Sequence, residues 1–246
     1  DSAVACYLFT SGTTADPKIV PLTHSNIVKT SIAGAQHMGL HDQDTLLAVL
    51  PLYHVYALIA NFYAIPSVGA RLVFQPSLKG TDIKQSLQEN DITIFPAVPQ
   101  LWELFFDGIE EKVRNQSPIK HLIFRFMVHH GNVFRRIGLG FIPQFIFKPV
   151  HDVFGHKIRF LLSGGAPLKI QYYRYYDNMG FSIVEGYGLT ETTGPICATQ
   201  LDTHKYGVVG KPLPGNEVKL DNINQDGRGE IWLRGEAVTP GYYNNS

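Results

Sequence analysis

The sequence predicts an α/β fold in which a mostly parallel sheet is flanked by helices. Apolar runs of strand length alternate with longer segments whose apolar residues recur at helical spacing. Strands that alternate with helices imply a parallel sheet with helices on both faces. From Gly207 onward, glycine, proline and asparagine separate short alternating runs, which predicts a small antiparallel β region.

The elements follow in order along the chain. The apolar run 3–9 predicts a buried strand, and residues 23–26 supply capping side chains for a helix that ends near Met38. Further strands are expected at 45–50, 71–74, 91–95, 157–162 and 181–184. Further helices are expected to begin at 51–56 and to span 82–89, 98–114 and the stretch that ends near Met179. We therefore expect an α/β part over 1–206 and the start of a β subdomain over 207–246.

Composition excludes some classes of protein. The 246 residues are 44% hydrophobic, which is enough for a substantial core. Lys plus Arg and Asp plus Glu both number 21, and a nucleic-acid-binding protein would normally be basic, so we expect no nucleic-acid partner. Cys6 and Cys197 fit no metal or redox spacing, and no signal peptide or membrane-spanning run is present. These features favour a cytoplasmic protein.

The stretch 112–151 interrupts the alternation. It contains seven basic and no acidic residues, which leaves 14 basic against 21 acidic groups elsewhere. The basic residues are Lys112, Arg114, Lys120, Arg125, Arg135, Arg136 and Lys148. They interleave with Phe and Ile at helical spacing, as in a helix on an anionic membrane surface. The alternative is a pair of packing helices with a solvated basic face.

A polar loop follows the first strand. It reads Phe-Thr-Ser-Gly-Thr-Thr-Ala-Asp-Pro-Lys over residues 9–18. Backbone N–H groups and hydroxyls in such a loop can converge on phosphate oxygens, and Lys18 adds positive charge. The spacing is not that of a Walker A loop. A plain surface loop would have a similar composition.

A second polar stretch, Glu-Gly-Tyr-Gly-Leu-Thr-Glu-Thr-Thr-Gly over 185–194, stands far along the chain. The two stretches together resemble the signatures of the AMP-forming adenylating enzymes, which include acyl-CoA synthetases, luciferases and peptide-synthetase adenylation domains. The insertion at 112–151 is similar to that of long-chain fatty-acyl-CoA synthetases. The resemblance covers the whole chain and implies an internal part of a longer enzyme, within its large N-terminal domain.

The resemblance implies a nucleotide site. By it, the β- and γ-phosphates of ATP would be bound by Thr10, Ser11, Gly12, Thr13, Thr14 and Lys18. Ala15 and Ile19 stand where the family usually has glycine, and a Cβ at a position that needs a positive φ costs about 1 kcal/mol. The loop would keep the residues that bind phosphate, but it would close less readily over the bound phosphates.

The second signature would bind the rest of the nucleotide. Glu191 would hold Mg²⁺, which prefers carboxylate and phosphate oxygens, and Thr190 would contact the α-phosphate. Tyr187 would lie against adenine, and Gly188 would allow close approach; Glu185 and Gly186 complete the stretch. The structural alternative is a strand, a turn and a helix with Glu191 in the first helical turn.

Two further positions are implied. The turn Ser163-Gly164-Gly165-Ala166-Pro167 follows a strand, and Gly164, Gly165 and Ala166 would contact adenine and the acyl group. The alternative is a tight turn in which Pro167 starts a helix. His54 would lie near the carboxylate that is activated, although a lone His beside apolar residues is often structural. Ala57 replaces a common family glycine.

The resemblance implies an ATP-dependent reaction that joins a carboxylic acid to AMP and then to coenzyme A. The insertion favours a long-chain fatty acid as that substrate. No protein nucleophile is needed, because positioning and electrostatics carry such chemistry. One alternative is an adenylating enzyme for aryl or amino acids. Another is a non-catalytic module that binds nucleotide or membrane. The family's ribose-binding Asp and catalytic Lys lie beyond residue 246, so the chain alone would turn over little.

Overall fold

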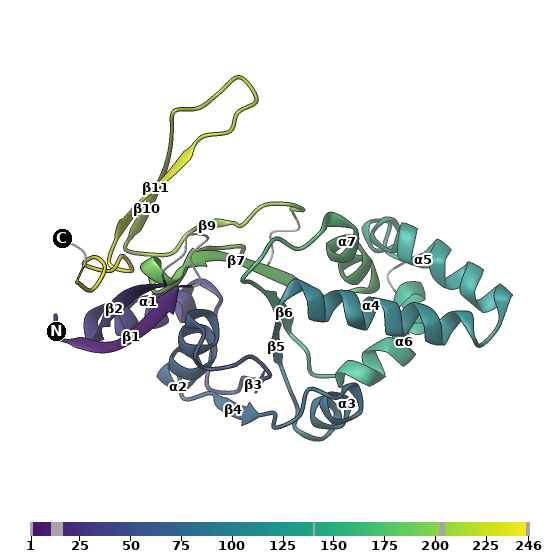
Figure 1. Ribbon diagram of the computed structural model, residues 1–246. Helices are drawn as coiled ribbons and strands as arrows, with labels where there is room; N and C mark the ends of the chain where they lie inside the picture. Colours follow the sequence, from purple (N-terminus) through teal and green to yellow (C-terminus); the bar gives the residue numbers. More distant parts are fainter. Residues whose placement is uncertain (1, 11–16, 140, 202–204, 245–246) are drawn as a thin grey trace.

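The computed structural model describes residues 2–10, 17–139, 141–201 and 205–244. Its centre is a seven-stranded sheet in the order β4-β3-β5-β6-β7-β8-β9 (Figure 1). The strands are β3 (Thr45–Ala48), β4 (Arg71–Phe74), β5 (Ile94–Ala97), β6 (Phe160–Ser163), β7 (Ile183–Leu189), β8 (Gly194–Ala198) and β9 (Lys211–Pro212). Pairing is parallel from β4 to β7 and antiparallel across β8 and β9. The expected mostly parallel α/β sheet is confirmed.

Helices cover both faces of this sheet. They are α1 (His24–His37), η1 (Ala57–Tyr63), α2 (Ala64–Ser67), α3 (Gly80–Glu89), α4 (Pro99–Arg114), α5 (Pro118–Arg136), α6 (Phe141–Phe154) and α7 (Ile170–Met179). The element η1 is a π-helix, a form that occurs often at functional sites. Thr23 caps α1 and forms a capping box with Asn26, as its sequence predicts.

The two faces have separate cores because successive strand residues point to opposite sides. Leu47, Phe95 and Leu161 pack with α3 to α7, whereas their neighbours Leu46, Ile94 and Phe160 pack with α1, η1 and α2. Strands buried on both sides read as continuous apolar runs, so the sequence identifies them well.

The first strand departs from the prediction. It forms as β1 (Val4–Thr10), but it pairs only with β2 (Lys18–Thr23) in a separate antiparallel hairpin. The prediction of a buried strand is wrong, because Tyr7 is 48% and Phe9 70% exposed. Its apolar content predicts a strand but not the elements that would cover it.

The basic stretch 112–151 forms the end of α4, all of α5 and most of α6. Phe124, Met127, Phe147 and Val150 are buried in the core beside α7, so the inner side of these helices packs as ordinary core. On the outer side Leu122, Phe126 and Phe145 are more than half exposed. Within the described residues, no helix has the length and apolar character needed to cross a bilayer.

The C-terminal part contains β9 at the edge of the main sheet and a hairpin of β10 (Asn216–Asp221) and β11 (Glu230–Gly235) that projects from the rest (Figure 1). The expected boundary at residue 207 stays a prediction. The antiparallel pairing of β9 with β8 and of β10 with β11 confirms the expected antiparallel strands in this part of the chain.

Candidate functional site

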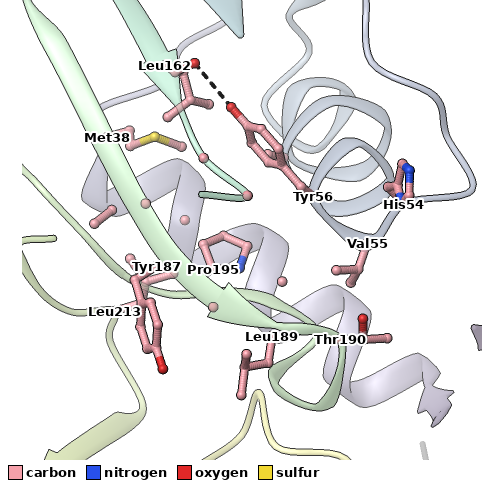
Figure 2. Close-up of a pocket in the computed structure, with 18 residues that line it drawn as sticks. Met38, His54, Val55, Tyr56, Leu162, Tyr187, Leu189, Thr190, Pro195 and Leu213 are labelled. Atoms are coloured by element: carbon pink, nitrogen blue, oxygen red, sulfur yellow. Dashed lines mark hydrogen bonds between the residues drawn. The ribbon is translucent and has the colours of Figure 1, made fainter. Parts of the chain in front are cut away.

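A cavity of about 240 Å³ lies at the carboxyl ends of β6 and β7, where they face α1 and η1 (Figure 2). Ligands of open α/β sheets bind at this edge. The residues that line it are Gly34, Met38, His54, Val55, Tyr56, Ala60, Leu162, Gly164, Gly165, Gly186, Tyr187, Gly188, Leu189, Thr190, Gly194, Pro195, Ala198 and Leu213. Most of this wall is apolar or backbone, and the polar side chains are few, which suits a small-molecule site.

The turn after β6 forms one wall of the cavity. Gly165 has φ +82°, a left-handed conformation that favours glycine. A Cβ at Gly164 would lie 3.1 Å from the ring of Tyr56, and the Tyr56 hydroxyl donates to the carbonyl oxygen of Leu162 over 3.2 Å (Figure 2). Burial raises the pKa of Tyr56, so the hydroxyl remains a donor.

The alternative, in which Pro167 starts a helix directly after the turn, is wrong. Helix α7 begins at Ile170 with Lys169 at its N-cap, so Pro167 lies in the turn itself. Ala166 is not among the cavity-lining residues. The extended turn keeps the two glycines at the cavity.

The second signature lies on a strand rather than in a loop. Strand β7 continues to Leu189 because it pairs with β8, with an irregularity between Tyr187 and Gly188. A Cβ at Gly188 would lie 1.8 Å from the carbonyl oxygen of Gly194. Close packing of the two strands therefore requires this glycine, whether or not a ligand also approaches it.

Glu185 is not among the residues that line the cavity. It is 6% exposed, and its Oε1 has no hydrogen-bond partner among the described residues. Burial raises the pKa of Tyr173, and the charges of Asp177 and Glu185 raise it further. Burial raises the pKa of Glu185, and a hydrogen bond from the backbone of Leu168 opposes that shift in part. The structure thus separates Glu185 from Gly186 and Tyr187, which line the cavity.

Glu191 lies in a short 3₁₀ turn, η2 (Thr190–Thr192), that leads directly into β8. The alternative of a full helix after the signature is wrong, because the chain turns back to pair antiparallel with β7. Thr190 lines the cavity, whereas Glu191 faces the segment near the chain's end. The Tyr242 hydroxyl donates to Oε1 of Glu191 over 2.8 Å.

Tyr242 also connects the two signatures. Its ring lies 4.5 Å from Nζ of Lys18, within the range of a cation–π contact. The backbone N–H of Tyr243 donates to Ile19, and that of Thr239 donates to Glu191. Sequence reasoning missed Tyr242, although the Gly-Tyr-Tyr stretch 241–243 is visible as a polar turn with aromatic side chains.

The polar loop itself lies mostly outside the described residues. Ser11, Gly12, Thr13, Thr14 and Ala15 belong to that part of the chain. The two ends are described: Thr10 and Lys18 face each other in the β1–β2 register, and the Thr10 hydroxyl donates to the carbonyl oxygen of Lys18 over 3.5 Å. The hairpin therefore holds the two ends of the loop together beside Glu191.

His54 lies at the other side of the cavity, at the start of the helical segment that continues into η1 (Figure 2). Its ring centroid is 4.5 Å from that of Tyr53, and the residue is exposed. It has no hydrogen bond from its side chain within the described part of the chain, so its ring nitrogens are available to a ligand.

The described residues include one carboxylate, Glu191, that could help to hold a Mg²⁺ ion. No group of three or more His, Cys, Asp or Glu side chains converges among the described residues, so a cage made only of protein is not present there. Mg²⁺ needs only one or two carboxylates when phosphate and water supply the rest. The half-buried Glu191, beside the hairpin that carries Lys18, satisfies that requirement.

Known proteins resemble this chain over nearly its whole length. Long chain acyl-CoA synthetase 8 of Arabidopsis thaliana is 34% identical over 99% of this chain and 38% of its own length. Long-chain-fatty-acid–CoA ligase 3 of Saccharomyces cerevisiae is 30% identical over 98% of this chain and 36% of its own length. The chain therefore spans less than half of these relatives.

A solved structure has the same fold. O-succinylbenzoate coenzyme A synthetase from Bacillus subtilis, in complex with ATP and magnesium ion, matches with a TM-score of 0.71 and 25% identity, over 99% of this chain and 44% of that one. The family model described as AMP-binding enzyme matches residues 1–243. The resemblance carried by the two signatures is thereby confirmed, and the chain belongs to the family of AMP-binding enzymes.

Proposed function

We propose that this chain is part of an ATP-dependent ligase that activates a long-chain fatty acid to acyl-AMP and then transfers the acyl group to coenzyme A. The observation that carries the proposal is the meeting of both signatures at one sheet edge, with Thr190 and Tyr187 in the cavity and Lys18 linked to Glu191 through Tyr242. The two relatives named above carry this activity in their names.

The residues would act by position and charge. Tyr187, Gly164 and Gly165 offer a flat surface and open backbone for an adenine ring, and the Thr190 hydroxyl lies at the same cavity for a phosphate oxygen. Thr10, Ser11, Gly12, Thr13, Thr14 and Lys18 would bind the outer phosphates. Bound Mg²⁺, held by Glu191, would neutralise charge on the leaving pyrophosphate.

The cavity supports an apolar acid. Met38, Ala60, Leu162, Pro195 and Leu213 supply apolar wall, and the exposed His54 lines the same cavity, where its ring could face a carboxylate. An aryl acid would also suit an apolar wall, and the Bacillus subtilis enzyme is named for an acid of that kind, o-succinylbenzoate. Long-chain preference therefore rests on the relatives, and a substrate panel decides it.

The outer side of α5 and α6 supports peripheral contact with an anionic membrane. Leu122 is 71%, Phe126 55% and Phe145 80% exposed, beside the basic residues of the same stretch. Co-sedimentation of the full-length protein with anionic liposomes tests this. Replacing Leu122, Phe126 and Phe145 with Ser should reduce the bound fraction, and unchanged binding would remove the proposal.

The decisive experiment is acid-dependent ATP–pyrophosphate exchange by the full-length protein, with palmitate, benzoate and a panel of amino acids. Exchange with palmitate alone supports the proposal; exchange with another acid identifies a different adenylating enzyme. Glu191→Gln should abolish exchange, whereas Glu217→Gln, which changes an exposed residue on β10, should not. No exchange with any acid would favour a non-catalytic module.

A further inference from the structure

A second cavity, of about 660 Å³, lies away from the nucleotide site, between α4, α5 and α7. Its size is within the range of small-molecule sites. Nothing in the proposed reaction uses this cavity, and it lies on the opposite face of the sheet from α1 and η1.

Helical spacing directs polar side chains into the cavity. On α5 the lining residues Arg125, His129 and Asn132 recur at positions that share one helix face. On α7 Gln171, Arg174 and Asn178 do the same. The two helices pack closely at Gly131, where an added Cβ would lie 2.2 Å from the carbonyl oxygen of Asn178. The arginines lie toward the amino ends of both helices from this contact.

Both guanidinium groups are available. Neither Arg125 nor Arg174 forms a hydrogen bond or ion pair within the described residues, and Arg174 instead lies 5.0 Å from the ring of Tyr206. Glu110 is the one carboxylate among the lining residues, and its Oε2 lies 3.2 Å from Nε2 of His121. The buried carboxylate of Asp177, behind this wall, accepts hydrogen bonds from Asn132 and Tyr206. The lining therefore carries an excess of positive charge.

We propose that this cavity is a binding site for a phosphomonoester. Two arginines that line one cavity match a dianion with several acceptor oxygens better than they match a single carboxylate. Phe106, Val128 and the ring of Tyr175 supply an apolar wall for the organic part of the ligand. The phosphomonoester is either a free metabolite or a lipid headgroup, and the exposed Leu122 and Phe126 on the same helix favour the lipid.

The test uses the full-length protein and two probes. One is glycerol 3-phosphate, measured by calorimetric titration. The other is phosphatidylcholine vesicles that contain phosphatidic acid, compared with vesicles of equal surface charge that contain phosphatidylserine. The variant combines Arg125→Gln with Arg174→Gln. The matched control combines Arg114→Gln with Lys120→Gln, two exposed basic residues nearby that do not line the cavity.

We expect the double variant to weaken glycerol 3-phosphate binding, or the preference for phosphatidic acid over phosphatidylserine vesicles, by about tenfold or more for each arginine. The control should leave both quantities unchanged, although it can lower binding to both kinds of anionic vesicle equally. Loss in both arms means that a free phosphomonoester suffices; loss with phosphatidic acid alone assigns the lipid headgroup. Equal binding by wild type and double variant, or equal loss of either quantity in the control, would overturn the proposal. Val128→Phe adds volume inside the cavity without changing its charge, so it should weaken binding of the same probe.

Discussion

The hydroxyl of Tyr242 donates a hydrogen bond to Oε1 of Glu191 over 2.8 Å, while its ring faces Nζ of Lys18 at 4.5 Å. One side chain near the chain's end therefore contacts both signatures, which lie far apart in the sequence. The hydrogen bond to Glu191 raises the pKa of Tyr242, with burial and the charge of Glu191 acting in the same direction. Tyr242 is thus a positioning residue for the carboxylate and the lysine.

Replacing Tyr242 with Phe should test that role. The ring and its contact with Lys18 remain, but Glu191 loses a donor, at a cost of about 1 kcal/mol in its orientation. We expect pyrophosphate exchange by the full-length protein to fall by about fivefold, with a higher Mg²⁺ concentration needed for half-maximal rate. Rates measured across a Mg²⁺ titration check this.

Tyr243 supplies the matched control. Its ring packs edge-on against Tyr7 at 5.1 Å, and its hydroxyl has no hydrogen bond among the described residues. Tyr243→Phe should leave the Mg²⁺ dependence unchanged. Equal effects of the two substitutions would show that the stretch acts only through packing.

Two glycines on neighbouring helices should respond in opposite directions to alanine. An added Cβ at Gly108 on α4 meets nothing within 4 Å, so Gly108→Ala should stabilise the fold by about 1 kcal/mol through helix propensity. Gly131→Ala on α5 would place a methyl group 2.2 Å from the carbonyl oxygen of Asn178. We expect a loss of about 1–3 kcal/mol, because α5 and α7 must separate.

Urea unfolding of the full-length protein, followed by circular dichroism, measures both changes. Gly108→Ala also controls for any general effect of alanine in a helix. A stabilising Gly131→Ala would mean that α5 is not packed against α7 as described.

The sequence predicts the parallel strands and their helices well, because each is a single apolar run or one helical stripe bounded by turn residues. The first strand shows the limit of that reasoning. The run that ends at Phe9 is as apolar as a core strand, yet its one strand partner in the described part is β2, so Phe9 remains 70% exposed. Burial depends on what packs above a strand, which its own residues do not encode.

The candidate site is predictable to a similar degree. Carboxyl ends of parallel strands meet at one edge, so Gly164, Tyr187 and Thr190 line one cavity, and their roles in binding a nucleotide stay predictions. The strand through Tyr187 is not predictable from its glycine-rich sequence, because it forms by pairing with β8. Tyr242 is missed because its partners are distant in sequence and a Gly-Tyr-Tyr stretch has no chemical signature alone.

The buried Glu185 predicts how stability depends on pH. Burial raises its pKa in the folded state, so between the unfolded and folded pKa values the folded protein holds the extra proton. Stability should therefore fall as pH rises through that window, from weakly acidic pH upward. Glu185→Gln should remove this contribution, so that the variant gains stability over wild type as pH increases.

Thermal unfolding of both proteins from pH 4 to pH 8 checks this difference, where pH 4 is about the ordinary pKa of a glutamate. Asp221→Asn, at a half-buried site on β10, is the control. Parallel pH profiles for wild type and Glu185→Gln would show that the pKa of Glu185 does not differ between the folded and the unfolded protein.

The contact between Gly164 and Tyr56 makes a final prediction, on substrate binding. A Cβ at Gly164 would lie 3.1 Å from the Tyr56 ring, and that ring is held by the hydrogen bond to Leu162. Gly164→Ala should push the ring into the cavity and raise KM for the acid by about tenfold, which is about 1.4 kcal/mol. Tyr56→Ala removes the obstructing ring, so the double variant Gly164→Ala with Tyr56→Ala should lose little beyond Tyr56→Ala alone. Steady-state kinetics with acid and ATP varied separately, on all four proteins, measure the coupling. Additive losses would mean that Gly164 acts on bound substrate directly and not through Tyr56.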